Sequence, residues 1–132
     1  MTKVVVDASV IIASLLNEPE KGRLEELTSG VQLVAPGSLP WEVGNALSAS
    51  FKKKRFIDVK AAHAVIKEFT DIPIQLVHVD LKDAIDICFK RGIYAYDAYM
   101  ILCARQVRAP LLTLDHRLAI VAEEEKIKIV EV

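Results

Sequence analysis

Short runs of apolar, mostly β-branched residues alternate with segments of helical length along the chain. The first run, Lys3 to Val6, is apolar at every position after the lysine, which is typical of a central parallel strand covered on both faces. Similar runs predict further strands at Gln32 to Ala35, Ile74 to Val79, Leu111 to Leu114 and Ile127 to Val130. The pattern therefore predicts a five-stranded sheet.

Helical periodicity fills the segments between these runs. Ser38, Asp58 and Asp80 are suited to cap helices, and Gly30 and Gly92 are suited to end them. The expected helices cover approximately residues 9–16, 20–28, 39–53, 58–70, 81–91, 96–107 and 116–125. Strands separated by helices predict an α/β fold, a three-layer α/β/α sandwich around a mostly parallel sheet, with residues 1–132 as a single domain.

Composition narrows the class of protein. The 132 residues carry a formal charge of −1 and are 52% hydrophobic, which fits a globular domain and excludes a disordered chain. No apolar run approaches the roughly 18 residues of a membrane span, and the stretch Val4 to Leu16 contains Asp7 and lacks the basic flank of a secretory signal. We therefore expect a cytoplasmic protein without membrane association. Cys88 and Cys103 lie in apolar helical patterns without a CxxC partner, so we interpret them as free core thiols.

Three acidic residues follow predicted strands. Asp7 ends the first strand, Asp115 ends the Leu111 to Leu114 run, and Glu42 lies in the first turn of the helix after the second strand. Because parallel strands end at one edge of a sheet, and helices that follow them begin there, we expect these side chains to face one crevice.

Asp97 is a less regular case. It shares a helix face with Met100, Ile101 and Ala104, the face that periodicity assigns to the core. Two predicted helices separate strands three and four, so simple alternation places the start of this helix at the opposite edge of the sheet. The extended link from Gly92 to Tyr96 spans roughly 17 Å, enough to carry the chain back. The spacing is compatible with either placement.

Each acid alone is suited to cap a helix. Gathered together, they repel one another by about 4 kcal/mol per pair at 4 Å and an effective dielectric of 20. Arg117 is the only basic residue beside them in sequence. An all-oxygen set of carboxylates suits Mg²⁺ or Mn²⁺, whereas Zn²⁺ prefers His and Cys ligands. Two such ions would support in-line displacement at a phosphodiester. The chain has no Gly-rich phosphate loop, so a nucleotide cofactor is not expected.

Four ordered segments, which together extend over essentially the whole chain, resemble a known family. They are Val4-Val-Val-Asp7-Ala-Ser9, Leu39-Pro-Trp-Glu42-Val-Gly-Asn45-Ala-Leu47, Tyr96-Asp97-Ala-Tyr-Met-Ile-Leu-Cys-Ala104 and Leu111-Leu-Thr113-Leu-Asp115-His-Arg-Leu118. This pattern resembles the PIN-domain ribonucleases, specifically the VapC-like toxins of toxin–antitoxin pairs. The resemblance implies Mg²⁺- or Mn²⁺-dependent endonucleolytic cleavage of RNA, usually by a homodimer, and a cognate antitoxin that blocks the site.

The resemblance also implies roles for individual residues. Asp7, Glu42, Asp97 and Asp115 would form the acidic quartet that binds metal and carries out catalysis. The polar residues Ser9, Asn45 and Thr113 would support these carboxylates by hydrogen bonding. The likeness places Asp97 in the crevice with the other acids.

Binding of RNA requires positive charge near its phosphates. The net charge of this chain is near zero, which argues against RNA binding by overall charge alone. The dense basic cluster Lys52 to Arg55 closes the helix that begins near Glu42. Its side chains fit either a solvated helix C-terminus or an RNA-backbone contact. We take Lys53, Lys54, Arg55 and Arg117 as candidate RNA contacts.

Two other functions remain open. One is a PIN-like module that binds RNA or a protein with little catalytic activity, and the other is a structure-specific DNA nuclease. Four retained carboxylates favour an enzyme over a binding module, because a binding module gains nothing from their repulsion. The compact chain shows no inserted arches or clamps, which disfavours a flap nuclease, and competition between RNA and flap DNA would decide.

Overall fold

A computed structural model describes residues 2–53 and 58–132. Over these residues the sheet has four parallel strands in the order β3-β2-β1-β4. The strands are β1 (Lys3–Val6), β2 (Gln32–Pro36), β3 (Ile74–Val77) and β4 (Leu111–Leu112). Val5 of β1 is in register with Val34 of β2 and Leu111 of β4. The parallel α/β architecture is confirmed.

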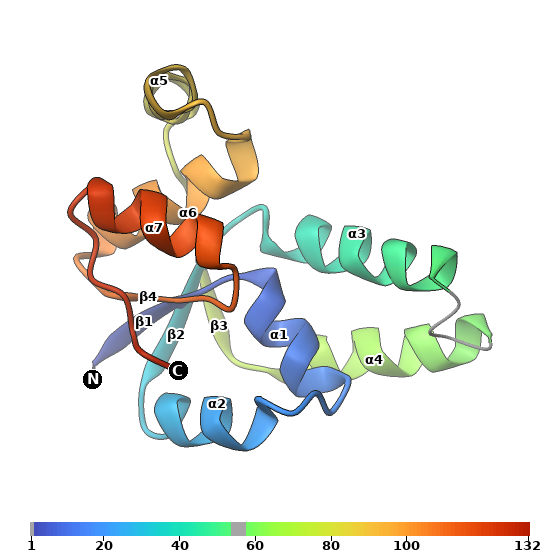
Figure 1. Ribbon diagram of the computed structural model, residues 1–132. Coiled ribbons are helices and arrows are strands. Elements are labelled where there is room, and N and C mark those ends of the chain that lie inside the picture. Colours follow the sequence, from blue (N-terminus) through green and yellow to red (C-terminus); the bar gives the residue numbers. More distant parts are fainter. Residues whose placement is uncertain (1, 54–57) are drawn as a thin grey trace.

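Seven helices occur in the described ranges. They are α1 (Ala8–Leu15), α2 (Lys21–Thr28), α3 (Leu39–Lys52), α4 (Val59–Asp71), α5 (Leu81–Arg91), α6 (Ala95–Val107) and α7 (His116–Glu124). Figure 1 shows α5, α6 and α7 on one side of the sheet and α1 and α2 on the other, while α3 and α4 extend together to one side. α6 crosses the sheet in contact with β1, β2 and β4, and α5 packs on α6.

Helix ends follow the expected local chemistry. The carboxylates of Asp7, Asp58, Asp80 and Asp115 each accept a hydrogen bond from a backbone amide in the first turn of the helix that follows. Gly92 ends α5 in the left-handed conformation with φ 65°, which costs glycine little because it has no Cβ.

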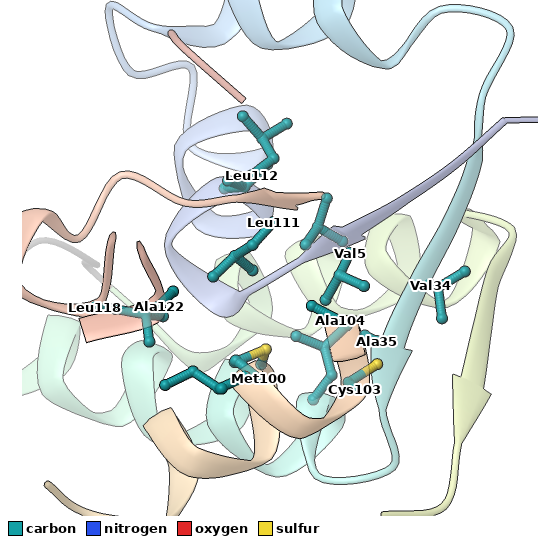
Figure 2. Packing of buried hydrophobic residues seen from close by; sticks show 14 of the residues in the cluster. Val5, Val34, Ala35, Met100, Cys103, Ala104, Leu111, Leu112, Leu118 and Ala122 are labelled. Atoms are coloured by element: carbon teal, nitrogen blue, oxygen red, sulfur yellow. The ribbon is translucent and has the colours of Figure 1, made fainter. Parts of the chain in front are cut away.

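The core includes Val10, Ile11 and Leu24 of α1 and α2, and another part of it lies between the sheet and α6. Val5, Val34, Leu111 and Leu112 are fully buried on the strands, and Ile101 and Cys103 are fully buried on α6. Figure 2 shows these strand residues in one packed cluster with Met100, Cys103 and Ala104 of α6 and with Leu118 and Ala122 of α7. Each large apolar side chain buried in this way contributes roughly 1.5–3 kcal/mol relative to its exposed state. The core therefore fixes α6, and with it Asp97, against the sheet.

The prediction of a fifth strand is wrong. Residues 127–130 form only an isolated parallel bridge between Leu111 and Ile129. The Leu111 amide donates to the Lys128 carbonyl and the Val130 amide donates to the Leu111 carbonyl, each at 2.9 Å. β4 offers only two residues for pairing, because the chain turns after it to form α7. The sheet therefore has four strands in the described part of the chain.

The strand order creates a crevice. β1 lies between β2 and β4, and the connections from β1 to β2 and from β3 to β4 place these two neighbours on opposite sides of it. Such a switch point leaves an opening beyond the carboxyl ends of the strands, where parallel sheets bind ligands. Among the described residues, no helix is both long enough and apolar enough to cross a membrane.

Candidate active site

Asp7 lies at the carboxyl end of β1 and is held on both oxygens. Its Oδ1 accepts from the Ser9 hydroxyl at 2.6 Å and from the Val10 amide at 3.3 Å, and its Oδ2 accepts from the Thr113 hydroxyl at 2.5 Å. Only 6% of the residue is exposed. This burial raises the pKa of Asp7, with the nearby Asp115 carboxylate adding to the rise and the three hydrogen bonds opposing it.

The ends of β1 and β4 are joined through these hydroxyls. The Thr113 hydroxyl accepts from the Asp115 amide at 3.0 Å while donating to Asp7. The Ser9 hydroxyl accepts from the Leu114 amide, also at 3.0 Å. Two hydroxyl groups thus couple the carboxylate of one strand end to the backbone of the other, across the switch point of the sheet.

Glu42 lies in the first turn of α3, half-buried above the same edge. Its Oε2 accepts a hydrogen bond from the Ser38 hydroxyl at 3.0 Å. Burial raises the pKa of Glu42 to about 7, and the negative charges of Asp7 and Asp97 act in the same direction, while the Ser38 bond lowers it. Ser38 precedes α3 but makes no side-chain cap, because its hydroxyl is directed to Glu42.

Asp97 lies in the first turn of α6 and lines the same cleft as Asp7, so the open question of its placement is answered. Figure 1 shows that α5 stands away from the strands and that α6 then crosses the sheet. Burial raises the pKa of Asp97, followed by the charge of Asp115, whereas Arg117 lowers it and Asp7 raises it further. In the described part of the chain no hydrogen bond to the Asp97 carboxylate occurs.

Asp115 caps α7. Its Oδ1 accepts from the amides of Arg117 at 3.0 Å and Leu118 at 3.3 Å, and the residue is exposed. The cap fixes the Asp115 carboxylate at the start of α7. The Asp115 amide donates a hydrogen bond to the nearby Thr113 hydroxyl.

The four carboxylates line one open cleft of about 220 Å³. Its walls also include Ser9, Asn45 and Tyr96. No lysine or arginine lines the cleft among residues 2–53 and 58–132. Asn45 reaches the cleft, but over the same ranges it makes no hydrogen bond to any of the acids. The result is a concentrated negative potential, opposed among the described residues by Arg117, which lies outside the cleft lining but acts on Asp97.

The donor set fits a hard divalent cation, since it consists of carboxylate oxygens. The arrangement is not a closed cage: no three His, Cys, Asp or Glu side chains of the described residues are grouped as ligands of one ion. Glu42 is turned toward Ser38, and Asp115 toward the amides of α7.

The predicted RNA contacts have different outcomes. Arg117, in the first turn of α7, is close enough to lower the pKa of Asp97. Lys53 directly follows α3 as its C-cap, and eleven positions at about 1.5 Å each separate it from Glu42 by roughly 16 Å. Lys54 and Arg55 lie outside the described residues.

Two residues of the site were not anticipated. Ser38 holds Glu42, and Tyr96 forms part of the cleft wall. A signal for each was present, since Ser38 precedes Glu42 by one helical turn and Tyr96 directly precedes Asp97.

A comparison with known families decides the affiliation, because the PIN domain profile matches residues 4–124. The chain belongs to the PIN domain family. A curated relative, Ribonuclease VapC3 of Pyrobaculum aerophilum, is 31% identical over 121 residues, which cover 89% of this chain and 92% of the relative.

Solved structures agree on the PIN fold. VapC20 of Mycobacterium tuberculosis, described as a sarcin-ricin loop cleaving toxin, aligns with a TM-score of 0.66 at 16% identity and covers 98% of each chain. VapBC2 of Rickettsia felis, solved with a DNA fragment of its promoter, aligns with a TM-score of 0.65 at 13% identity and also covers 98% of each chain. At these identities the likeness shows the fold alone.

Proposed function

We propose that this PIN-domain protein is an endoribonuclease, the toxin of a toxin–antitoxin pair, and that it cleaves RNA phosphodiester bonds with Mg²⁺ or Mn²⁺. One observation carries the proposal: four carboxylates from distant parts of the chain line one cleft that contains no described cation. The 31% identity to a ribonuclease over most of both chains supports the choice of RNA as substrate.

The four acids of the cleft would have different roles. Asp7 and Asp97 bind the ion, and Glu42 and Asp115 complete its coordination directly or through water. When bound, the ion supplies positive charge at the scissile phosphate and makes a coordinated water more acidic. Without the ion, burial raises the pKa of Glu42 to about 7, and a bound cation would favour its ionised form.

The supporting groups act on the carboxylates. Ser9 and Thr113 hold Asp7 in a fixed orientation, which limits the reorganisation needed on binding. Asn45, exposed on the cleft wall, is placed to contact the substrate or an ion-bound water. Arg117 is the described cation best placed to reach a phosphate near Asp97.

Cleavage of a structured RNA tests the proposal. We expect products with Mg²⁺ or Mn²⁺, none with chelator, and at least a hundredfold loss in Asp97→Asn that still unfolds cooperatively. Retained cleavage in Asp97→Asn would remove that residue from the mechanism. Tight RNA binding without cleavage by the wild type would favour the binding module, and preferential cutting of flap DNA would favour a DNA nuclease.

The proposed homodimer has a candidate surface on α5. Leu81, Ile85 and Phe89 recur at a spacing of four residues and are 61%, 54% and 91% exposed. The helix begins with Asp80 and Asp83 and ends with basic residues. A second copy packed antiparallel would therefore join two apolar faces.

Sedimentation velocity tests this surface. Ile85→Lys should convert a wild-type dimer to a monomer, while Val59→Lys, an equally exposed change on α4, should not. A monomeric wild type, or a dimeric Ile85→Lys, would contradict the proposed surface.

A cognate antitoxin is the other proposed partner. The structural neighbour from Rickettsia felis is named as a toxin–antitoxin complex, which supports such a partner here. RNA as substrate and a protein inhibitor both fit action in the cytoplasm. Co-expression with the product of a short neighbouring gene should give a stable complex without nuclease activity, and failure to form one would contradict the pairing.

A further inference from the structure

A second hollow, opposite in charge to the acidic cleft, lies at the far end of α6. It has a volume of about 360 Å³, within the range of pockets that bind small ligands. Its lining includes four cations and one acid among the described residues: Arg105, Arg108, Lys126, Lys128 and Glu125. Eleven positions at about 1.5 Å each separate Arg108 from Asp97, so this basic hollow lies roughly 16 Å from the cleft along α6.

The cations of the basic hollow outnumber the acid beside them. Glu125 is buried, and its carboxylate already contacts three cations, Arg105 among them, within 3.1 Å. Arg108, Lys126 and Lys128 are exposed. In the described part of the chain these three side chains form no ion pair. The basic hollow is therefore a concentrated positive potential on a chain whose net charge is −1.

Two backbone positions of the basic hollow have an unusual conformation for their residue type. Arg108, which caps the end of α6, has φ 55°, and Lys126, which follows the end of α7, has φ 68°. Glycine adopts this left-handed conformation at lower cost and is the usual residue at such helix ends. Both helices end in a cation instead, and the two cations line the same hollow.

Capping of the helix ends does not account for this gathering of cations. The Ala109 amide donates to the Ala104 carbonyl at 3.1 Å at the end of α6, and the Ile127 amide donates to the Ala122 carbonyl at 2.9 Å at the end of α7. Backbone amides thus already satisfy carbonyls of both last turns. The helix dipole favours a cation at each end, whereas four cations line the hollow.

We propose that the basic hollow binds a small anion with two linked phosphate groups, such as inorganic pyrophosphate or a nucleoside diphosphate. Guanidinium groups bind phosphate through paired hydrogen bonds, and lysine ammonium groups add compact positive charges. One phosphate group carries about −1.5 to −2 charges near neutral pH. Two such groups come close to balancing the four cations and one carboxylate of the lining.

A small anion fits this hollow better than a nucleic acid does. The cations converge on one hollow, whereas a protein that binds a nucleic-acid strand places its cations along a groove that follows the backbone. Ala109 and Pro110 line the hollow beside the cations and offer an apolar wall to the organic part of a ligand. The inference does not depend on the proposed function, because it uses none of the four acids.

Isothermal titration of the metal-free protein with pyrophosphate tests the basic hollow. We expect saturable binding of one pyrophosphate per chain. Arg108→Gly removes a cation and suits the positive φ, so it should bind at least tenfold more weakly while its Tm stays close to that of the wild type. Lys128→Gln should weaken binding as well. Lys60→Gln, an equal change of charge at an exposed position of α4, is the matched control and should bind as the wild type does.

Two further ligands identify what the basic hollow binds. Tighter binding of ADP than of pyrophosphate would assign a nucleoside ligand, and equal or weaker binding would assign an inorganic one. Either result supports the site. A ten-nucleotide single-stranded RNA that displaces pyrophosphate would make the hollow an RNA contact and overturn the proposal.

The remaining outcomes separate this site from the acidic cleft. Absence of saturable binding, or equal affinity in Arg108→Gly, Lys128→Gln and Lys60→Gln, would contradict a phosphate site in the basic hollow. Asp97→Asn should bind pyrophosphate as the wild type does, because Asp97 lies at the other end of α6. Loss of pyrophosphate binding in Asp97→Asn would place the anion at the cleft and overturn the proposal. A failure of RNA cleavage leaves all these expectations unchanged.

Discussion

The four acids of the cleft differ in how firmly they are held. Asp7 has three donors on its two oxygens, and Glu42 and Asp115 each have local partners, whereas the Asp97 carboxylate accepts no hydrogen bond from a described residue. Fixed and unfixed carboxylates thus meet in one cleft. We expect the fixed carboxylate to set the position of a bound ligand and the others to adjust around it.

Thr113 is the residue on which this arrangement depends. Thr113→Val keeps the side-chain shape but leaves the Asp7 Oδ2 and the Asp115 amide without their partner. We expect the free energy of unfolding, measured with denaturant, to be about 1–2 kcal/mol lower than in the wild type. The rate of RNA cleavage should fall at least tenfold. Thr113→Ser retains the hydroxyl and should recover most of both. Wild-type stability and activity in Thr113→Val would show that the hydroxyl does not position Asp7.

The raised pKa of Glu42 predicts that the free energy of unfolding changes with pH near neutrality. The folded protein holds the Glu42 proton up to a pKa of about 7, whereas the unfolded chain loses it near 4.5. The unfolded state therefore binds fewer protons in this window, and stability without metal should fall as the pH rises from 4.5 to 7.

Glu42→Gln tests that slope. At pH 8 without metal, the variant should be more stable than the wild type by on the order of 1 kcal/mol after solvent screening is allowed for, or about 3–5 °C in Tm. At pH 4.5 the two should agree. Glu68→Gln, an exposed change on α4, serves as the control. Equal pH slopes in the wild type and Glu42→Gln would contradict the burial of this charge.

At the scale of elements, α5 and α6 are tied to the end of α7 by ionic contacts. The Glu125 side chain is 6% exposed and accepts from Arg91 at 2.6 Å, Arg105 at 2.8 Å and Lys90 at 3.1 Å. These contacts, led by the Arg105 hydrogen bond, lower the pKa of Glu125 to about 2. The network fixes the helix that carries Asp97 from its far end.

Glu125→Gln should show the opposite pH behaviour to Glu42→Gln. The folded pKa is depressed, so the contribution of Glu125 is complete above its ordinary pKa of 4.5 and is lost as the pH falls toward 2. We expect Glu125→Gln to lower the free energy of unfolding by about 2 kcal/mol at pH 7. This is less than for a fully buried ion pair, because Arg105 is half exposed. Chemical unfolding across pH measures it. A constant difference down to pH 2 would rule out the ionic explanation.

Sequence periodicity predicted most elements and failed where pairing depends on distant partners. The apolar run at residues 127–130 is long enough for a strand, but its neighbour β4 is cut short by the turn that brings Thr113 to Asp7. The position of Asp97 likewise depends on how α5 is oriented, which local pattern does not determine. Asp7, Glu42 and Asp115 were predictable because strand ends in a parallel sheet share one edge.

At the scale of the whole molecule, the fold brings four carboxylates into one cleft that no described lysine or arginine lines. Burial and mutual repulsion both raise the pKa values of Asp7, Glu42 and Asp97. Such a cleft favours a bound cation, since an ion that binds only the folded state also stabilises it. The acids and the hydroxyl groups that support Asp7 lie together at the carboxyl edge of the sheet.

Isothermal titration of the metal-free protein with Mn²⁺ at pH 8 tests the central claim most directly. The account predicts saturable binding to the wild type, binding weakened at least tenfold in Asp97→Asn, and unchanged binding in Asp86→Asn, a control on the exposed face of α5. Equal Mn²⁺ affinity in the wild type and in Asp97→Asn would contradict a shared metal centre in the cleft.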